Sequence, residues 1–376
     1  ESSRYHIAFN GEIYNFRRLR DAFSSDYSFF SSSDTEVILR SFQQCGEKTW
    51  SRLNGMFAVA VYDAKPGALF LARDHAGIKP LYYYHDQEKL LFASEIKALL
   101  ASGLVPVKTD QEGLSLYLQI GYLPGSRTAY RGIQKVLPAE GLKIDSAGIH
   151  RARFWDVRDS LSNDENHQSF PVAAEELERL LLRSVEDQMI SDVPIGAFLS
   201  GGIDSSMIVA LMSKLAAEKV RTFTVGFSNM GYYDERPYAA RVSAEFKTEH
   251  HEFTVEAGIE EILPKLISAF DEPFADSSAI PTFCLAQLAR QFVTVALSGT
   301  GGDEIFGGYR KYRAAHWAAT YTLLPKTVRT AIEKSLSVLP ASRRSLWQER
   351  ALLLQRFSAL IPEAEVGHQL NSIFTL

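Results

Sequence analysis

The second half of the sequence alternates between helix-like and strand-like segments, and this alternation limits the possible folds more than any other feature. Apolar residues recur at helical spacing over 173–190, and short runs rich in apolar, β-branched and aromatic residues follow, with helical patterns between them. The strand-like runs cover 194–200, 221–227, 249–255 and 292–298. Strands that alternate with helices form parallel βαβ units, so we predict an α/β domain with a doubly wound parallel sheet.

A glycine-rich turn, SGGIDSS, joins the first of these strands to the next helix. Ligands of open α/β sheets lie beyond the carboxyl ends of the strands, where a helix start offers unpaired backbone N–H groups. Gly201 and Gly202 permit a close backbone approach to an anion. Hydroxyl donors are added by Ser200, Ser205 and Ser206. The turn therefore predicts a phosphate-binding loop, although no lysine follows it as in a Walker loop, and a serine-capped turn is the alternative.

A second stretch repeats this design further along the chain. SGTGGDE, residues 298–304, follows another predicted strand. Two such turns at neighbouring strand ends would face one nucleotide. Asp204 and Asp303 would then each lend a carboxylate oxygen to Mg²⁺, an ion that binds one or two carboxylates together with substrate phosphates. Taken singly, each aspartate is as readily explained as a helix cap.

The first part of the sequence predicts a separate α+β domain. Strand patterns occur in YHIAFNGEIYN, MFAVAVYD, ALFLARD and LYYYH, and a helical pattern in TEVILRSFQQC ends at Gly46. The AKPG segment between two of these strands predicts a hairpin turn. Residues 108–155 carry loop and short-strand signals, and we expect them to join two bodies. We place the domains at 1–157 and 170–376, because the polar segment 158–169 is untypical of a core.

Composition narrows the classes of function. The chain has 376 residues, of which 46% are hydrophobic, a net charge of −5 and no apolar run long enough for a membrane span. These values predict a soluble protein with small-molecule substrates and without nucleic-acid or membrane partners, and they leave a homodimer open. Cys45 and Cys284 lie far apart, which fits the reducing cytoplasm, and we expect both to be packing residues. His250 and His251 would point to opposite faces of a strand.

Together these motifs resemble a known family. SGGIDSS resembles the pyrophosphate-binding loop of the ATP pyrophosphatase superfamily, whose members adenylate a substrate with ATP. With SGTGGDEIFGGYRKY, FNGEIYNF, SDTEVIL, LNGMFAVAVYD, ARDHAGIKPLYYY and FASEIKAL, the chain resembles glutamine-hydrolysing asparagine synthetase over nearly its whole length. The resemblance implies an incomplete glutaminase-like domain of the N-terminal nucleophile type and an ATP pyrophosphatase-type synthetase domain. It also implies a carbon–nitrogen ligase that activates aspartate as β-aspartyl-AMP and takes ammonia from glutamine.

The resemblance assigns roles to individual residues. In the first domain, Asn10 and Gly11 match the oxyanion hole, and Glu12 and Asp34 match groups that hold the glutamine amine. An amide, a backbone N–H and two carboxylates suit these tasks chemically.

In the synthetase domain, the resemblance implies ATP and Mg²⁺ as ligands. The ATP-binding positions are Leu199, Ser200, Gly201, Gly202, Asp204, Ser205, Ser206, Val225, Ser298 and Gly299, and the magnesium positions are Asp204 and Asp303. Tyr309, which precedes Arg310 and Lys311, matches a catalytic position. Residues 271–281 match a stretch near the amino-acid substrate, with a solvated turn as the alternative.

Three features depart from the family pattern. Family glutaminases use an N-terminal cysteine whose own α-amine is the general base, and this sequence begins with Glu1. We therefore expect the chain to be truncated at its start, and also at its end, where the family continues into a further helical region. Thr300 stands where the family has an acidic residue that helps to form the adenylate.

Two alternatives to asparagine synthesis follow from these departures. A related adenylating synthetase would form another amide or a lactam without glutaminase activity, and a degenerate subunit would bind nucleotide without catalysis. A preference for a carboxylate other than aspartate would identify the first alternative. Binding of ATP without turnover would identify the second.

Overall fold

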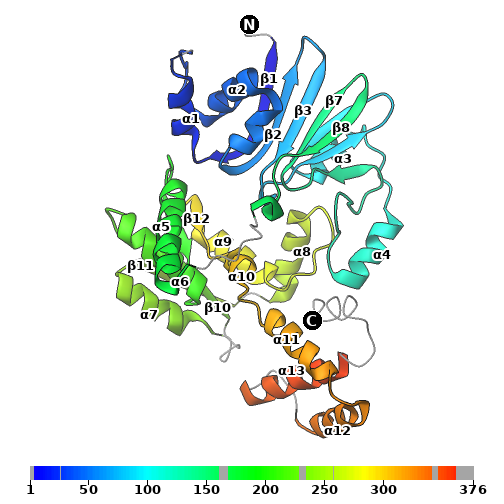
Figure 1. Cartoon of the computed structure of the whole chain (residues 1–376), viewed down its shortest axis with the longest axis vertical. Helices are drawn as coiled ribbons and strands as arrows, with labels where there is room; N and C mark the ends of the chain where they lie inside the picture. Colours follow the sequence, from blue (N-terminus) through cyan, green and yellow to red (C-terminus); the bar gives the residue numbers. More distant parts are fainter. Residues whose placement is uncertain are drawn as a thin grey trace. The chain divides into compact units, whose positions relative to one another are not determined.

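The chain folds into two units (Figure 1). The computed structural model describes residues 4–25, 27–160, 168–227, 234–256, 258–340 and 346–360. Unit 1 comprises Glu1–Leu118, Tyr122–Leu180 and Ala269–Phe274, and unit 2 comprises Gln119–Gly121, Leu181–Ser268 and Ala275–Leu376. Residues 161–167 of the predicted polar boundary lie outside the described residues. Among the helices of the described ranges, none has the length and apolar composition needed to cross a bilayer.

Unit 1 contains a five-stranded antiparallel sheet with the strand order β1-β2-β3-β7-β8. Its strands are β1 (Tyr5–Ile13), β2 (Gly55–Asp63), β3 (Ala68–Arg73), β7 (Glu140–Asp145) and β8 (Gly148–Arg153). The predicted hairpin is confirmed: β2 and β3 pair with Asp63 opposite Ala68, and Gly67 completes the AKPG turn with a φ of 67°. A left-handed φ of this kind favours glycine.

A second, three-stranded sheet in unit 1 has the order β5-β4-β6. It consists of β4 (Tyr82–His85), β5 (Leu90–Ala93) and β6 (Ile133–Lys135). Buried side chains from both sheets form one cluster, which includes Leu71 and Leu142 from the larger sheet and Tyr83 from the smaller one. Three further helices of this part of the chain are α3 (Ile96–Ala101), α4 (Gln111–Ile120) and η2 (Val157–Ser160).

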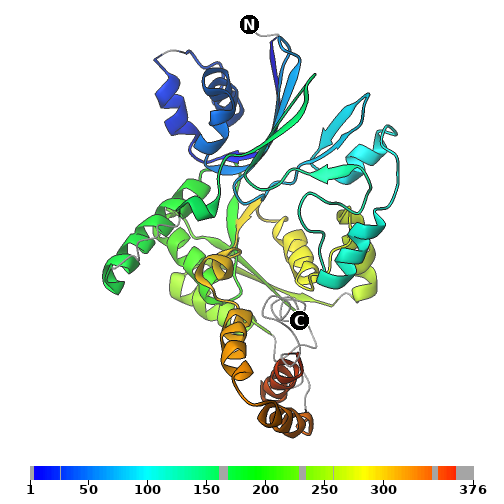
Figure 2. The same ribbon diagram turned by 45° about the vertical axis from the view of Figure 1, so that its right-hand side comes forward.

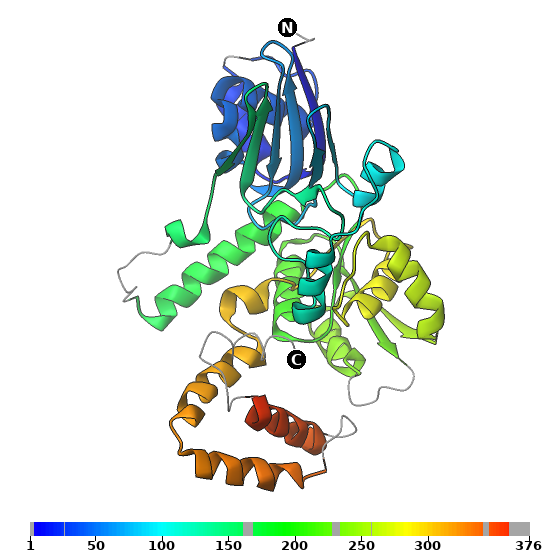
Figure 3. The same ribbon diagram turned by 90° about the vertical axis from the view of Figure 1, so that its right-hand side faces the viewer.

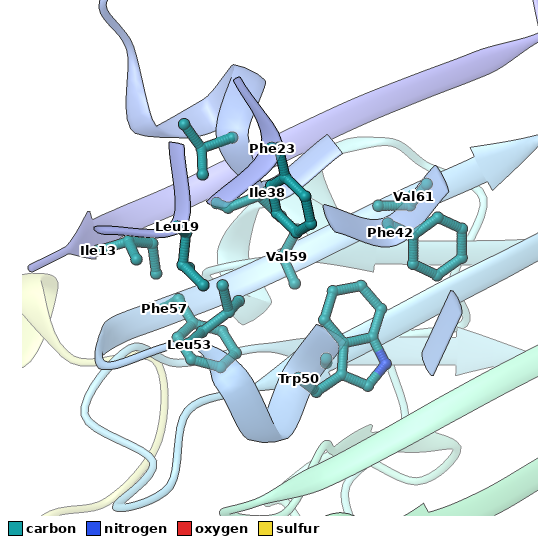
Figure 4. Packing of buried hydrophobic residues seen from close by; sticks show 12 residues of the cluster. Ile13, Leu19, Phe23, Ile38, Phe42, Trp50, Leu53, Phe57, Val59 and Val61 are labelled. Carbon is teal, nitrogen blue, oxygen red and sulfur yellow. The ribbon is translucent and has the colours of Figure 1, made fainter. Parts of the chain in front are cut away.

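Helices cover the other face of the larger sheet, and Figure 2 shows them in blue beside the strands. They are α1 (Phe16–Phe23), α2 (Asp34–Cys45) and the 3-10 helix η1 (Gly46–Arg52). Helix α2 begins after Ser33, whose side chain accepts the Thr35 N–H, and ends at Gly46 as predicted. Figure 4 shows Phe23 and Ile38 from the helices and Trp50 from η1 packed around Val59 of β2.

Residues 108–155, which we predicted to connect two domains, also form part of the larger sheet of unit 1. Strands β7 and β8 lie in this segment and extend the five-stranded sheet of unit 1, with Leu71 opposite Leu142. β7 is largely buried, but β8 is an edge strand whose residues from His150 to Arg153 are exposed. An exposed polar edge strand has no apolar face, so the alternation that marks the other strands is missing.

Unit 2 contains a parallel four-stranded sheet with the order β11-β10-β9-β12. Its strands are β9 (Ile195–Phe198), β10 (Arg221–Phe227), β11 (Glu249–Val255) and β12 (Val295–Leu297). All four strands fall within the predicted runs, and the prediction of a parallel α/β sheet is confirmed. The runs of β9 and β10 are recognisable because helices bury both faces of the central strands, whereas β11, at the edge of the sheet, has no buried residue.

The helices of unit 2 pack on the two faces of this sheet. Side chains of α6 (Ile203–Leu215), α7 (Arg236–Phe246) and the part of α5 (Phe170–Gln188) that lies in unit 2 form one cluster with Ala197 and Leu297. On the other face, Ala289 and Leu285 of α9 (Ala279–Ala289) pack with Phe223 of β10.

The remaining helices of unit 2 follow the sheet or connect its strands. They are α8 (Ile259–Ala269), α10 (Gly302–Phe306), α11 (Arg310–Thr322), α12 (Lys326–Ser337) and α13 (Leu346–Leu360). Figure 3 shows α11 to α13 in orange and red, and α12 packs against α13.

Candidate active sites

The strand order of the parallel sheet reverses between β9 and β12. β10 lies on one side of β9, and β12 pairs with the other side, where Leu297 is opposite Ala197. The carboxyl ends of two strands at such a reversal form the usual ligand crevice of an open α/β sheet. Residues 199–202 follow β9 and residues 298–301 follow β12. Both predicted glycine-rich turns therefore leave the sheet at its ligand-binding point.

The first turn is closed by its own serine side chains. The hydroxyl oxygens of Ser200 and Ser205 lie 3.0 Å apart. The Ser200 N–H donates to Ser205 Oγ at 3.3 Å, and the Gly202 N–H donates to Ser200 Oγ at 3.2 Å. Ser205 is buried, whereas Ser206 is half-buried. These contacts give the hydroxyls of Ser200 and Ser205 a part in shaping the loop, beside the donor role expected from the sequence.

The two turns lie against each other through glycines. A Cβ added at Gly299 would lie 2.6 Å from the backbone N of Ser205 and 2.7 Å from the carbonyl carbon of Asp204. A Cβ added at Gly302 would lie 2.6 Å from Cγ of Asp204. The distances at Gly299 are to backbone atoms, so glycine is required there, whereas a side chain at Gly302 would displace the Asp204 carboxylate. The second turn therefore packs directly on the start of α6 and on the Asp204 carboxylate.

Asp303 lies in the same turn as Gly302, and its side chain is half-buried like that of Asp204. A Cβ added at Gly308 would lie 2.1 Å from Asp303 Oδ1, and the Gly308 N–H donates to the Asp303 carbonyl at 3.0 Å. The Asp204 carboxylate thus lies beside Gly302, the residue before Asp303. In the described ranges, no group of three or more His, Cys, Asp or Glu side chains is arranged to hold a metal.

Tyr309 follows the second turn and is bound to a carboxylate. Its hydroxyl donates to Glu304 Oε1 at 2.6 Å. This hydrogen bond raises the pKa of Tyr309 to about 12, with smaller contributions from burial and from the charges of Glu304 and Asp303. The phenol is therefore neutral and a hydrogen-bond donor near neutral pH. Thr300 is held differently, because its Oγ1 accepts a hydrogen bond from Ser298 Oγ at 2.9 Å.

Replacing Glu304 by glutamine is expected to lower the pKa of Tyr309, because the first cause of the upward shift is the bond to the ionised carboxylate. The folded chain holds this proton more tightly than the unfolded chain. The pair therefore stabilises the fold below the ordinary tyrosine pKa of 10.0, and this stabilisation is lost as the pH rises towards 12. Absorbance titration of the phenolate band in the unmodified chain, Glu304→Gln and Tyr309→Phe measures the effect. An unchanged titration in Glu304→Gln would contradict it.

The other predicted ATP-binding residues, Leu199 and Val225, lie on the neighbouring strand ends. Leu199 is buried, and its N–H donates to the Phe223 carbonyl of β10 at 2.9 Å. Val225 is half-buried in β10, opposite Phe253 of β11. The next residue, Gly226, is covered by the Arg236 side chain, since a Cβ added there would lie 2.2 Å from Arg236 Nε. The sequence did not predict a role for Arg236, because only its contact with Gly226 in the folded chain shows that it lies near the candidate ATP-binding residues.

The predicted glutamine-site residues lie on β1 and at the start of α2 in unit 1. Asn10 Nδ2 donates to Ser94 Oγ at 3.1 Å. A Cβ added at Gly11 would lie 2.0 Å from the Met56 carbonyl oxygen of β2, so only glycine fits there. Asp34 Oδ2 accepts the Ile13 N–H at 3.1 Å, which brings this carboxylate to the backbone next to Glu12. Three of the four predicted residues are thus adjacent in β1, and the fourth is bonded to the same strand.

A buried carboxylate that the sequence did not single out supports this strand pair. Asp74 is 1% exposed and follows β3. Its Oδ2 accepts the N–H of Phe57 at 3.1 Å, and Phe57 is the residue opposite Gly11 in the β1–β2 register. Asp74 and Glu12 also contribute, after burial, to raising the pKa of Tyr14 to about 12. The signal in the sequence is the ARDHAG segment, where an aspartate precedes a glycine-containing turn.

The acidic residues at the start of 271–281 are paired rather than solvated. Asp271 Oδ2 accepts the Ile96 N–H at 2.6 Å. Lys97 Nζ lies 3.3 Å from Asp271 Oδ1, and Lys135 Nζ lies 2.6 Å from Glu272 Oε1. These contacts fall within unit 1, to which Ala269–Phe274 belongs. The role of 271–281 near the amino-acid substrate remains a prediction.

The residues to which the sequence gave no site role have structural partners. His250 Nδ1 lies 2.9 Å from Thr222 Oγ1, whereas the His251 ring stacks on Phe223 at a centroid distance of 5.3 Å. Cys284 is buried and Cys45 is half-buried, and both are free thiols.

Two protein families match the chain. Residues 176–370 match the asparagine synthase family, and residues 1–155 match a glutamine amidotransferase domain. The chain is 37% identical to a Methanocaldococcus jannaschii protein provisionally named asparagine synthetase (glutamine-hydrolyzing) 2, over 87% of this chain and 63% of that protein. It is 36% identical to asparagine synthetase (glutamine-hydrolyzing) 1 of Bacillus subtilis, over 92% of this chain and 54% of that protein. It is 33% identical to asparagine synthetase B (glutamine-hydrolyzing) of Escherichia coli, over 82% of this chain and 53% of that protein. The chain therefore spans between 53% and 63% of the length of these relatives.

Proposed function

Because the chain belongs to the asparagine synthase family, we propose that it takes part in ATP-dependent synthesis of asparagine from aspartate. Aspartate would be activated as β-aspartyl-AMP, and ammonia would come from glutamine hydrolysed by the amidotransferase domain. We assign residues 1–157 to the glutaminase-like domain and residues 170–376 to the synthetase domain.

One observation carries the proposal for the synthetase domain. The turns after β9 and β12 leave the sheet where its strand order reverses, and Gly299 and Gly302 pack on the backbone and carboxylate of Asp204. Two glycine-bearing turns in contact at this point suit a ligand with several phosphates, because backbone N–H groups at a helix start and at strand ends are the usual donors to such ligands. ATP is the ligand that the family relationship favours.

The residues at the two turns have separate tasks in this proposal. Backbone N–H groups of Gly201 and Gly299 would bind phosphate oxygens, while the Gly202 N–H holds the loop through Ser200 Oγ. Asp204 and Asp303 would hold Mg²⁺, which fits their chemistry because half-buried carboxylates beside a phosphate site are ordinary ligands of this ion. When bound, the ion would neutralise charge on the pyrophosphate that leaves. Tyr309, neutral and oriented by Glu304, would donate a hydrogen bond at the catalytic position.

In the glutaminase-like domain, the family relationship and the chemistry of the side chains likewise suggest a role for each candidate residue. The side-chain amide of Asn10 and the N–H of Gly11 would bind the oxyanion formed during glutamine hydrolysis. Glu12 and Asp34 would bind the ammonium group of glutamine, and the bond from Ile13 to Asp34 supports their proximity.

Asp204→Asn and Asp303→Asn are each expected to raise the Kd of ATP with Mg²⁺ by roughly tenfold or more, because each removes a charged ligand of the ion. Isothermal titration of this chain with ATP, with and without Mg²⁺, measures the change. The effect of either substitution should be small when Mg²⁺ is left out. Asp192→Asn, at an exposed position of the same unit, is the matched control and should leave the Kd unchanged.

The reaction itself is tested on the full-length gene product. Pyrophosphate release is measured with ATP, Mg²⁺, ammonia and a panel of carboxylates that includes aspartate. We expect release that depends on aspartate and a second product that is asparagine. Release without aspartate dependence, or preference for another acid, would contradict asparagine synthesis.

A further inference from the structure

We propose that Arg236 is a positioning residue that holds the first turn of α7 against the glycine-rich turn 199–202 and so sets the affinity of unit 2 for nucleotide. The proposal rests on the ATP site proposed above and adds a residue to which no binding role was assigned. Arg236 is the first residue of α7, and its side chain is 20% exposed.

The guanidinium of Arg236 is fixed by three hydrogen bonds. Its Nε donates to Asp234 Oδ1 at 2.8 Å and its Nη2 donates to Asp234 Oδ2 at 2.6 Å. Its Nη1 donates to Thr254 Oγ1 of β11 at 2.6 Å. A bidentate pair with a carboxylate fixes both position and plane of a guanidinium. The start of α7 is therefore tied to the end of β11.

The same guanidinium lies on the backbone of β10. A Cβ added at Gly226 would lie 2.2 Å from Arg236 Nε and 2.7 Å from Arg236 Cζ. Gly226 follows Val225 directly, and Val225 is a predicted adenylate-binding position. The absence of a side chain at 226 is thus what allows Arg236 to reach across the strand end.

Two residues further along α7, the helix backbone contacts the glycine-rich turn 199–202. A Cβ added at Gly201 would lie 2.5 Å from Cβ of Tyr238 and 2.7 Å from the backbone N of Ala239. Gly201 has a φ of 79°, a left-handed conformation that favours glycine. One side chain, Arg236, therefore connects the strand end beside Val225 with the helix turn that packs on Gly201.

The contacts favour positioning over direct phosphate binding. The charge of Arg236 is paired with Asp234 at 2.6 Å, and Glu252 lies 3.9 Å away. Three of its nitrogens already donate to protein oxygens. A guanidinium that is neutralised in this way attracts an anion weakly, but it holds its surroundings rigidly. Preorganising the loop lowers the ordering cost of binding, and this is how Arg236 would increase affinity.

The test is a double-mutant cycle on this chain with ATP and Mg²⁺ as the probe. We expect Arg236→Ala to raise the Kd about tenfold, because it removes charge-assisted hydrogen bonds that hold the turn. Gly226→Ala should raise the Kd similarly, since the added methyl displaces the guanidinium. The double variant should bind no worse than Arg236→Ala alone, because the side chain nearest to the added methyl is then gone. Arg241→Ala, an exposed arginine on the same helix, is the matched control.

Hydrogen exchange of peptides covering 199–206 provides a readout that does not need ATP. We expect faster exchange there in Arg236→Ala, and not in Arg241→Ala, with unchanged exchange in the core strands β9 and β10. Faster exchange throughout unit 2 would reveal a general structural role and overturn the proposal. So would an unchanged Kd in Arg236→Ala, or additive losses in the double variant. If the unmodified chain binds no ATP, the proposed function fails, and the role of Arg236 in affinity fails with it. Unchanged variants of a chain that does bind ATP overturn only the Arg236 proposal.

Discussion

Replacing Gly299 by alanine is expected to abolish measurable ATP binding by unit 2 and to lower its free energy of unfolding by about 1–3 kcal/mol. The added Cβ would lie 2.6 Å from the Ser205 nitrogen and 2.7 Å from the Asp204 carbonyl carbon. Both are backbone atoms in the first turn of α6, so no rotamer change relieves the contact. The two turns must separate, and with them the groups proposed to bind one nucleotide. Isothermal titration with ATP and Mg²⁺ and urea denaturation measure the two effects.

Gly258→Ala is the matched control for this experiment. Gly258 also belongs to unit 2, and among the described residues a Cβ added there would meet no atom within 4 Å apart from its chain neighbours. The control should bind ATP normally and unfold like the unmodified chain. If Gly299→Ala bound ATP with an unchanged Kd, the contact between the two turns would be irrelevant to binding, and the proposed site would be wrong.

The fold of unit 2 could be predicted from the sequence because short apolar, β-branched and aromatic runs alternate with helical patterns. RTFTVGF and EHHEFTV are recognisable runs, and each ends at or beside a glycine, a charge or a polar turn. In unit 1, β8 escaped prediction because its residues from His150 to Arg153 face solvent at the edge of the sheet. Periodicity detects a repeated apolar face, and β8 offers little of one, because Ile149 packs on a buried cluster and the four residues after it are exposed.

The candidate sites could be predicted where the proposed binding residues lie together in a single loop. Gly201 and Asp204 stand in one recognisable turn, and the convergence with Gly299 follows from the order of the strands. The contribution of Arg236 depends on partners 18 residues away in β11, and that of Asp74 on partners 17 residues away in β2. Contacts at such separations are set by the register of strands and the packing of helices, which local sequence does not encode.

Asp74→Ala is expected to lower the free energy of unfolding of unit 1 by about 3–5 kcal/mol. The substitution removes a buried carboxylate and leaves the backbone N–H groups that it accepts without an acceptor. Asp74 Oδ2 accepts N–H groups of Phe57 at 3.1 Å and Lys79 at 2.9 Å. Its Oδ1 accepts N–H groups of Ala76 at 3.1 Å and Ile78 at 2.9 Å. Alanine satisfies none of these four donors, and little solvent reaches a residue that is 1% exposed. Urea denaturation followed by circular dichroism measures the loss.

Asp86→Ala separates the effect of burial from that of capping a turn. Asp86 also accepts two backbone N–H groups, from Glu88 and Lys89, each at 2.9 Å, but its side chain is 33% exposed. Water can replace the carboxylate there, so the expected loss of stability is much smaller than for Asp74→Ala. Because Phe57 lies opposite Gly11, the loss of Asp74 should also weaken glutamine binding, whereas the loss of Asp86 should not. Equal destabilisation by the two substitutions would show that the backbone donors around Asp74 find other acceptors, and that this carboxylate does not fix the strand pair beneath the candidate glutamine site.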